Sequence, residues 1–461
     1  MTSVFGRLGR GVLLCAIVAA PVSVAHAASA PKDSNVAPRA QSGSLSAIAA
    51  KRQQLLARMM DDPSNLDVAF EYASLSSEAG DLEGAISTLE RMLIYAPGLP
   101  RLDLELGVLY FRLGAYDSAQ SYFDAALAAP DVPAEVKARV APYLAAIKKQ
   151  SQSDGFSGDL TVGARYQTNA NSAPSSPNVI LGGLPFVLNA AGMSHPDTNA
   201  FVAGNFRYVH DLASQGDRLV ASLTTYGALY AKDGTLNTGV VEARIGPEFN
   251  LQRYGIEDGS VSVYGIVGGA IVAGAPYAGT GGAGIAIDKG FGPQTHVNVT
   301  GEYRYDGYRN SATRPTASDG TGSSFDGSTT LQYQINDSLT LFAIFHGERR
   351  LAKVGYLSDW EGGVIGGATV AFASPFHADN GDWQFTISGG YTGRQYDAPD
   401  PIVSATDRQV DREATVTGTL VVPFGGNWAL QSSVSYRRTL SNYDLDNTDN
   451  VSALAGVTRK F

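Results

Sequence analysis

From residue 156 onward, apolar and polar residues alternate with a period of two in segments of roughly ten residues. In the segment from 295 to 308, for example, Val299 and Tyr303 fall on one face, whereas Thr300 and Glu302 fall on the other. Successive side chains of a β-strand point to opposite sides of the sheet, so the pattern predicts strands with one apolar and one polar face. Barrels that cross a membrane show this alternation, with the apolar face toward lipid.

The region divides into about fourteen such segments, an even number within the range of membrane barrels. Their expected first residues are Gly158, Asn199, Arg218, Thr238, Gly259, Gly281, Thr295, Ser324, Leu339, Asp359, Trp383, Arg412, Trp428 and Asn450. Long connections at 167–198, 310–323 and 398–411 alternate with tight turns at 336–338 and 425–427. Outer-membrane barrels have short turns on the periplasmic side. Both ends of the barrel are therefore expected on that side.

The polar face often carries charged side chains in the middle of the strands. A secreted β-sandwich or adhesin also alternates and stays open as an alternative, but these charges favour a water-filled lumen. Charges that face a lumen can select what passes, or they can pair with one another and stiffen the barrel. The candidate lumen-lining residues are Arg165, Arg207, Glu242, Arg244, Glu248, Glu302, Arg304, Asp306, Glu348, Arg350, Arg394, Glu413, Arg437 and Lys460.

The last segment has an apolar face formed by Val451, Ala453, Ala455 and Val457, and the chain stops on Phe461. A strand that is apolar on one side and ends the chain on an aromatic residue is typical of the strand that closes an outer-membrane barrel. We expect it to pair with both the preceding segment and the first one. Phe461 is then the candidate signal for the barrel assembly machinery.

Between residues 44 and 150 the hydrophobic period becomes helical, and two stretches repeat at a spacing of 34 residues, the tetratricopeptide period. The residues expected to pack the repeats are Ala73, Gly80, Ala85 and Leu89 in the first stretch and Gly107, Tyr110, Gly114, Ala119 and Phe123 in the second. Helices at 45–60 and 134–149 would cover the ends. Stacked repeats form a concave surface for peptides or proteins, so the module predicts docking; the alternative is that it only braces the next domain.

The amino terminus reads as a secretory signal peptide at residues 1–27. Arg7 and Arg10 precede the apolar run 11–20, and Ala-His-Ala at 25–27 is a cleavage site. The apolar run is too short for a spanning helix, which needs about 20 residues. Cys15, the only cysteine, lies in this run, so we expect a mature chain without thiols. Residues 28–43 are expected to be a linker.

Composition and motifs exclude several classes of function. The net charge of −10 argues against a nucleic-acid partner. The stretch 279–284 matches GxGxxG only in form, because no helix is expected after it. We expect no cofactor, no metal and no enzymatic activity, with an outer-membrane hydrolase as a minor alternative. The predicted fold is an α+β multidomain chain, with tetratricopeptide helices at 44–150 and an antiparallel transmembrane barrel of about 14 strands at 156–461.

This combination resembles the surface lipoprotein assembly modulator family, the outer-membrane components of type XI secretion. The first strand runs into Gly163-Ala-Arg-Tyr-Gln-Thr-Asn-Ala-Asn171, which is similar to the family's opening motif. The end of the chain, from Ser441-Asn-Tyr443 to Phe461, resembles the family's closing hairpin. The helical region departs from the family in being short, with two clear repeats.

The resemblance implies transport rather than chemistry. The barrel would sit in the outer-membrane lipid and assist the passage of a lipoprotein or soluble protein to the cell surface. The periplasmic repeats would capture that cargo. The main alternative is an exopolysaccharide export porin, which joins many more repeats to a barrel and would favour aromatic platforms in the lumen. A passive solute porin is the third possibility, and it would not need a helical module.

Overall fold

The computed structural model describes residues 42–96, 99–113, 115–128, 134–150, 154–214, 216–256, 258–376 and 381–461. The predicted signal peptide and Gly114 lie outside the described residues. The chain divides into a helical unit and a β-unit, and the β-unit's first strand begins at Asp154. The first described helix begins at Ser42, so it includes the last two residues of the linker expected at 28–43.

The described helices of the first unit are α2 (Ser42–Asp61), α3 (Leu66–Glu78), α4 (Leu82–Tyr95), α5 (Pro100–Arg112), α6 (Tyr116–Ala128) and α7 (Ala134–Gln150). The side chains of Asn65 and Asp81 accept hydrogen bonds from the first turns of α3 and α4. Gly80 joins these helices with a φ of +84°, a left-handed conformation that glycine adopts without strain. The capping residues and this glycine therefore set the turn within the first repeat.

Five of the residues predicted to pack the repeats lie in the core of the helical unit, whereas Gly80 and Tyr110 are at least partly exposed. Ala73, Ala85, Leu89, Ala119 and Phe123 are each at most 4% exposed. Gly107 is needed because a Cβ at this position would lie 2.7 Å from the ring of Phe123. The close approach of α5 and α6 thus depends on a glycine in one helix and a phenylalanine in the other.

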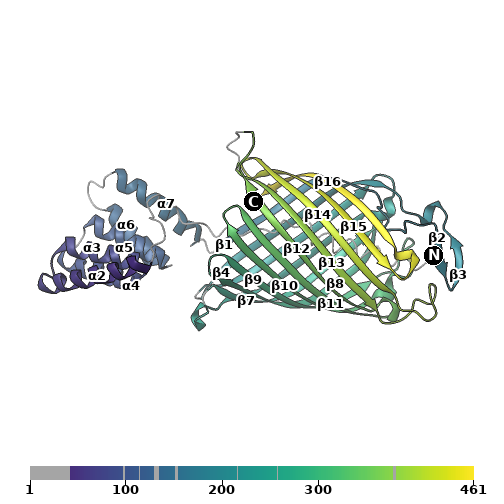
Figure 1. Cartoon of the computed structure of the whole chain (residues 1–461), viewed down its shortest axis with the longest axis horizontal. Helices are drawn as coiled ribbons and strands as arrows, with labels where there is room; N and C mark the ends of the chain where they lie inside the picture. Colours follow the sequence, from purple (N-terminus) through teal and green to yellow (C-terminus); the bar gives the residue numbers. More distant parts are fainter. Residues whose placement is uncertain are drawn as a thin grey trace. The chain divides into compact units, whose positions relative to one another are not determined.

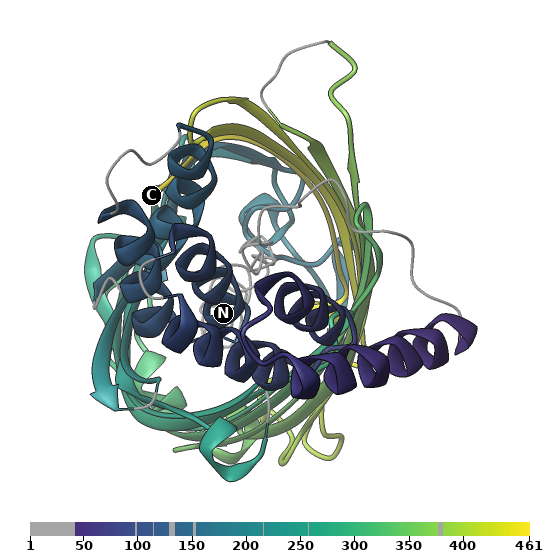
Figure 2. The ribbon, with the colours of Figure 1, turned by 90° about the vertical axis from the view of Figure 1, so that its left-hand side faces the viewer.

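The β-unit is a closed barrel of 14 antiparallel strands, as the alternating pattern predicts (Figures 1 and 2). The strands are β1 (Asp154–Gln167), β4 (Asp197–Ser214), β5 (Asp217–Tyr230), β6 (Thr238–Asn250), β7 (Gly259–Val272), β8 (Ala275–Phe291), β9 (Thr295–Tyr308), β10 (Gly322–Asn336), β11 (Leu339–Ala352), β12 (Asp359–Phe372), β13 (Trp383–Tyr396), β14 (Val410–Gly425), β15 (Trp428–Ser441) and β16 (Thr448–Lys460). A separate hairpin, β2 (Asn178–Leu181) and β3 (Leu184–Val187), lies between β1 and β4 in the sequence. The closed barrel excludes the soluble sandwich.

Thirteen of the fourteen predicted strand starts lie within four residues of the starts in the structure. Seven coincide, at Thr238, Gly259, Thr295, Leu339, Asp359, Trp383 and Trp428. The sixth strand begins at Ala275, six residues before the expected Gly281. Three of the six intervening residues are alanine or glycine, and Pro276 is a poor strand former, so the alternation is not visible there in the sequence.

The last strand closes the barrel as predicted, because β16 pairs with β15 on one side and β1 on the other. Gly163 lies opposite Gly456, and a Cβ at Gly163 would lie 2.3 Å from the carbonyl oxygen of Ala455. Beyond the ladder, the backbone N–H of Phe461 donates to the carbonyl oxygen of Gly158 at 3.0 Å. The two ends of the barrel sequence therefore meet at one rim, which we call the turn end; the opposite rim is the loop end.

The long predicted connections all lie at the loop end, and the two predicted tight turns lie at the turn end. One connection differs: β7 and β8 are joined at the loop end by only Ala273 and Gly274. The long β9–β10 connection lies over this hairpin, because Arg314 within it donates to the carbonyl oxygen of Thr235 in the β5–β6 connection at 3.4 Å. The long β9–β10 connection thus covers the short β7–β8 turn.

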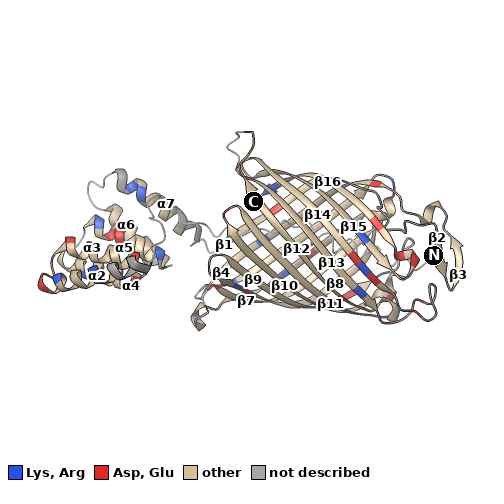
Figure 3. Ribbon diagram, viewed as in Figure 1, with Lys and Arg blue, Asp and Glu red and all other residues tan. Residues whose placement is uncertain are grey.

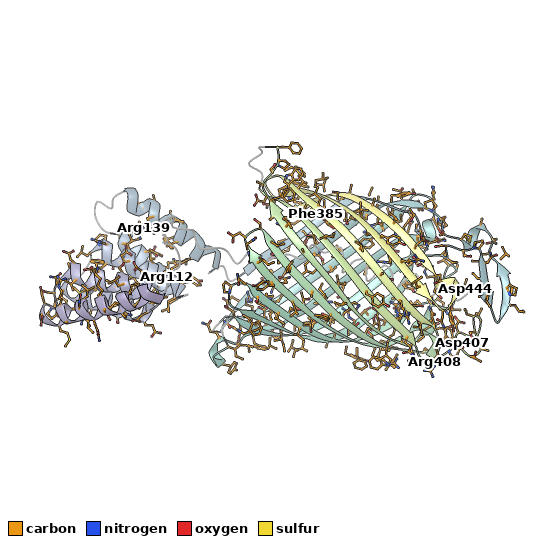
Figure 4. The ribbon with its side chains drawn as sticks, viewed as in Figure 1. Arg112, Arg139, Phe385, Asp407, Arg408 and Asp444 are labelled. Atoms are coloured by element: carbon orange, nitrogen blue, oxygen red, sulfur yellow. The ribbon has the colours of Figure 1, made fainter. Side chains whose placement is uncertain are left out.

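Other loop-end segments pack together around a small apolar core. Val179 of the β2–β3 hairpin, Val403 and Leu445 are buried with Tyr443. The backbone N–H of Ile180 donates to Asp444, which Figure 4 labels at this rim with Asp407 and Arg408. The loop end is therefore a structured surface.

The outer wall carries the apolar face of the alternation. Val267, Phe345 and Val434 are 64%, 48% and 59% exposed in the middle of their strands. A wall of exposed aliphatic and aromatic residues around a closed barrel requires lipid as its solvent. Among the helices that the structure describes, none has the length and apolar character needed to cross a bilayer.

Candidate functional site

The candidate site is the inner wall of the barrel. Contacts between strands that are not neighbours identify the inner face, because side chains can bridge over an intervening strand only on the concave side. Arg165 of β1 contacts Tyr226 of β5 in this way, and Arg350 of β11 contacts Tyr308 of β9. Residues that pair directly across neighbouring strands share a face, so the inner face can be followed around the barrel from these contacts. All fourteen candidate lumen residues lie on it. Their role in transport stays a prediction.

The densest group of charges is the central charge cluster, formed by Glu242, Arg244, Tyr264, Glu302 and Arg304. Arg304 of β9 lies 2.7 Å from Glu242 of β6 and 2.6 Å from Glu302 on its own strand. Arg244 lies 2.9 Å from Glu242 and 3.2 Å from Glu302, so two arginines and two glutamates alternate in a ring of contacts. Tyr264 donates a hydrogen bond to Glu302 at 2.8 Å.

A second group, the rim charge cluster, lies at the loop ends of β12, β13 and β14. Arg394 contacts Glu361, and it lies 3.9 Å from Asp359 and 3.8 Å from Asp411. Three carboxylates thus surround one guanidinium, and these three are at most 7% exposed at the side chain. In Figure 3, coloured charged positions are frequent at this end of the barrel.

Toward the turn end, two arginines share one carboxylate. Arg207 of β4 and Arg218 of β5 both contact Glu248 of β6, and each arginine side chain remains almost half exposed. Nearer the loop end, Arg437 of β15 lies 3.4 Å from Glu413 of β14. Of the two roles weighed for the lumen charges, the structure shows pairing in each of these groups. The exposed arginine surfaces still face the lumen.

Several inner charges were missed from the sequence. They are Asp159, Arg218, Asp326, Asp359, Glu361 and Asp411. Asp326 lies 4.0 Å from Arg304 and shares the alternation of Ser324 and Ser328, so strict counting along this strand would have found it. Asp359 is the first residue of β12 and Asp411 is the second residue of β14, so both lie at the loop end of the inner wall.

The inner wall also contains aromatic residues, which the list of charged candidates did not include. The guanidinium of Arg165 lies over the rings of Phe201 and Tyr226, at 5.4 and 5.9 Å. Arg244 lies 5.7 Å from the ring of Tyr264, and Arg350 lies 5.4 Å from that of Tyr308. These rings therefore have an arginine of the same chain at their faces.

The GxGxxG match at 279–284 lies inside β8, away from any helix, so it is part of the barrel wall. Among the residues that the structure describes, no group of three or more histidine, cysteine or acidic side chains is arranged to hold a metal ion. The rim charge cluster is occupied instead by the guanidinium of Arg394.

Phe461 lies beside the closing strand. Its ring is 45% exposed, and its centroid lies 6.2 Å from that of Phe206 and 5.2 Å from the guanidinium of Arg459. Arg459 also lies over the ring of Trp428 at 5.2 Å. Both aromatic residues at this rim therefore share one cation, which holds an otherwise exposed arginine against the outer wall.

Comparison with known proteins identifies the helical unit. A tetratricopeptide repeat model matches residues 76–141, so the module contains tetratricopeptide repeats. No curated protein sequence matches the chain.

Solved structures resemble one unit each. A bacterial polysaccharide outer membrane secretin is 10% identical, covers 66% of this chain and 98% of its own, and has a TM-score of 0.36. An anion-selective porin from Comamonas acidovorans is 9% identical, covers 67% and 99%, and has a TM-score of 0.33. A type III secretion chaperone from Yersinia enterocolitica, solved with a translocator peptide, is 17% identical, covers 24% and 86%, and has a TM-score of 0.22.

Proposed function

We propose that this protein is an outer-membrane barrel whose periplasmic tetratricopeptide module assists the transfer of a lipoprotein or soluble protein to the cell surface, as surface lipoprotein assembly modulators do. The barrel supplies a polar path or an insertion surface, and the module holds the cargo before transfer. No bond is made or broken, and no cofactor takes part. The observation that carries the proposal is a polar, charged lumen in the same chain as a peptide-binding type of repeat.

The membrane assignment rests on the apolar outer wall and on strand length. The shortest barrel strands have 13 residues, and about 9–11 tilted residues suffice to cross a bilayer. In outer-membrane barrels the short turns face the periplasm. The last helix ends at Gln150 and β1 starts at the turn end at Asp154, so the module belongs on the periplasmic side as well.

The preference for protein over polysaccharide rests on the inner aromatic residues. Sugar rings bind proteins by laying their C–H groups on open aromatic faces. Phe201, Tyr226, Tyr264 and Tyr308 instead have arginines over their rings. A charged wall with covered rings suits a polypeptide, which presents charged and hydrogen-bonding groups of both kinds.

The test is a gene deletion, followed in the same cells by measurement of surface lipoproteins, secreted proteins and exopolysaccharide. We expect one or more surface or secreted proteins to be lost while exopolysaccharide stays unchanged. The full chain should restore them, whereas a chain that lacks residues 44–150 but keeps its signal and barrel should not. Loss of exopolysaccharide with unchanged surface proteins would overturn the proposal in favour of sugar export. Loss of solute uptake alone would favour a porin.

A further inference from the structure

The tetratricopeptide module contains a buried carboxylate that its packing does not explain. Asp103, in the first turn of α5, is only 7% exposed. It has no hydrogen bond or ion pair with any residue that the structure describes, and burial raises the pKa of its carboxyl group. A carboxylate that is this little exposed and has no partner is poorly solvated, and such groups concentrate at functional sites.

A second carboxylate lies nearby, held by two tyrosines. Tyr110 of α5 and Tyr122 of α6 donate hydrogen bonds to the same oxygen of Glu90 on α4, at 2.6 and 3.3 Å. The two rings are stacked, with centroids 5.4 Å apart and planes 11° from parallel. The hydrogen bond to Glu90 raises the pKa of Tyr110 to about 12, so its hydroxyl remains a donor at neutral pH.

These four residues form one group, which we call the acidic tyrosine cluster: Glu90, Asp103, Tyr110 and Tyr122. Burial raises the pKa of Tyr122, and the negative charges of Glu90 and Asp103 raise it further, so both carboxylates act on this hydroxyl. Glu90, Tyr110 and Tyr122 are each partly exposed, so the cluster reaches the surface.

No lysine or arginine that the structure describes forms an ion pair with either carboxylate of the cluster. The guanidinium of Arg101, two residues before Asp103, lies over the ring of Phe70 at 4.5 Å. Arg112, two residues after Tyr110, donates to the carbonyl oxygen of Ser77 at 3.4 Å. Two negative charges and two stacked rings therefore meet without a cation from the described part of the chain.

We propose that the acidic tyrosine cluster binds the cationic side chain of a lysine or arginine in an extended segment of the cargo. The ammonium or guanidinium group donates to Glu90 and Asp103, and the tyrosine rings contact the cation and its aliphatic stem. The inference rests on the proposed function and adds the chemistry that the module recognises. It accounts for the partnerless Asp103, because the ligand supplies the missing positive charge.

The test uses the full chain, purified in detergent, and fluorescein-labelled peptides of identical length with lysine, arginine or norleucine at the centre. Fluorescence anisotropy should show that the lysine or arginine peptide binds about tenfold or more tightly than the norleucine peptide. Asp103→Asn and Glu90→Gln should each remove most of this preference, and added salt should weaken it. The matched control is Asp67→Asn, an exposed carboxylate in the first turn of α3, which should leave binding unchanged.

Circular dichroism checks that Asp103→Asn keeps its helices; Glu90→Gln supplies an independent variant if it does not. Equal affinity for the norleucine peptide, or full binding by both folded variants, would overturn the inference. The proposed function is separable in cells. A chain with both Asp103→Asn and Glu90→Gln can be compared with the gene deletion. If this double variant delivers surface proteins normally while the deletion does not, the cation site is wrong and protein transfer is supported. If the deletion affects exopolysaccharide alone, protein transfer itself falls.

Discussion

The helical unit and the barrel place the same kinds of side chain on opposite sides. In the helical unit Leu89 and Phe123 are buried, whereas the ion pair of Lys51 and Glu71 is exposed. In the barrel Val267 is exposed on the outer wall, and the pair of Glu302 and Arg304 lies within the inner wall. The helical unit therefore has an apolar interior, whereas the barrel, which begins at Asp154, has an apolar exterior.

The surrounding solvent therefore determines whether apolar side chains lie inside or outside each unit. Water surrounds the helices, so burial of apolar area stabilises them. Lipid surrounds the barrel, so its apolar side chains need no interior, and its backbone polar groups are satisfied by the closed ladder. The ion pairs differ accordingly: Lys51 and Glu71, 2.6 Å apart, are 55% and 43% exposed at the side chain, whereas Arg304 and Glu302, also 2.6 Å apart, are 11% and 9% exposed.

The largest expected effect concerns the residue that closes the barrel. Deletion of Phe461, or Phe461→Ala, should prevent most of the barrel from inserting, far more than any lumen substitution. The reason is the prediction that the barrel assembly machinery reads this aromatic residue beside the strand that pairs with β1. The amount of barrel in outer-membrane fractions measures this, with Lys460→Gln as the neighbouring control. Normal levels without Phe461 would contradict the assignment.

Truncation of a large aromatic residue should affect the stability of the two units differently. Phe123→Ala should lower the free energy of unfolding of the helical unit by about 3–5 kcal/mol, because it leaves a cavity in a core that water cannot fill favourably. Phe345→Ala on the outer wall should cost less, since lipid chains fill the space of the ring and no cavity adds to the lost transfer free energy. Denaturant unfolding of the full chain, followed by helical circular dichroism and by barrel unfolding, tests both. Equal losses of unfolding free energy at Phe123 and Phe345 would contradict the difference in packing between the two units.

A charge on the outer wall should be costly where a charge on the inner wall is not. Val267→Arg places a guanidinium against lipid near the middle of β7 and should destabilise the barrel by about 2–4 kcal/mol. Ser262→Arg, on the inner alternation of the same strand, should cost much less because water reaches it. Folding into lipid vesicles across a urea series measures the difference. A similar cost at both positions would argue against a wet lumen.

Removal of one charge should matter more in the lumen than on the helices. Glu242→Gln weakens its contacts with Arg244 and Arg304, so the barrel should lose about 1–3 kcal/mol. In the helical unit, Glu105→Gln breaks an exposed pair with Arg139 at 3.4 Å and should cost less than about 1 kcal/mol. The same unfolding experiment compares them. A larger effect at Glu105 would reverse the ranking of inner and exposed pairs.

The smallest expected effect is a pH dependence of the helical unit. The pKa of Asp103 is raised in the folded state, so the folded chain binds this proton more tightly than the unfolded chain. Its charge therefore destabilises the helices above the raised pKa, and that penalty disappears as the pH falls toward the ordinary range near 4. Asp103→Asn should remove this component and stabilise the module at neutral pH. Thermal melting of both chains at neutral and acidic pH measures the difference, and parallel pH profiles would count against it.

Much of the fold could be predicted because the alternation within each segment shows which residues lie on which face of the strand. Trp383–Tyr396 is visible as a strand from Phe385, Ile387 and Tyr391 on one side and Thr386, Ser388 and Arg394 on the other. The helical repeats were visible for a similar reason, since Ala85 and Ala119 occupy the same position 34 residues apart. The pattern was lost where alanine, glycine and proline interrupt the alternation, as before Gly281.

The order of helices and strands and the polarity of each strand face follow from the sequence alone, because both are local periodic properties. Which charges meet depends on the tertiary structure. Glu242 and Arg304 lie on strands separated by two others, and they reach each other only because the barrel is curved and closed. Asp103 became informative only when α5 packed between α4 and α6, which buried its carboxylate beside Tyr122 without a cation. Burial and pairing depend on long-range packing, which periodicity along the chain does not contain.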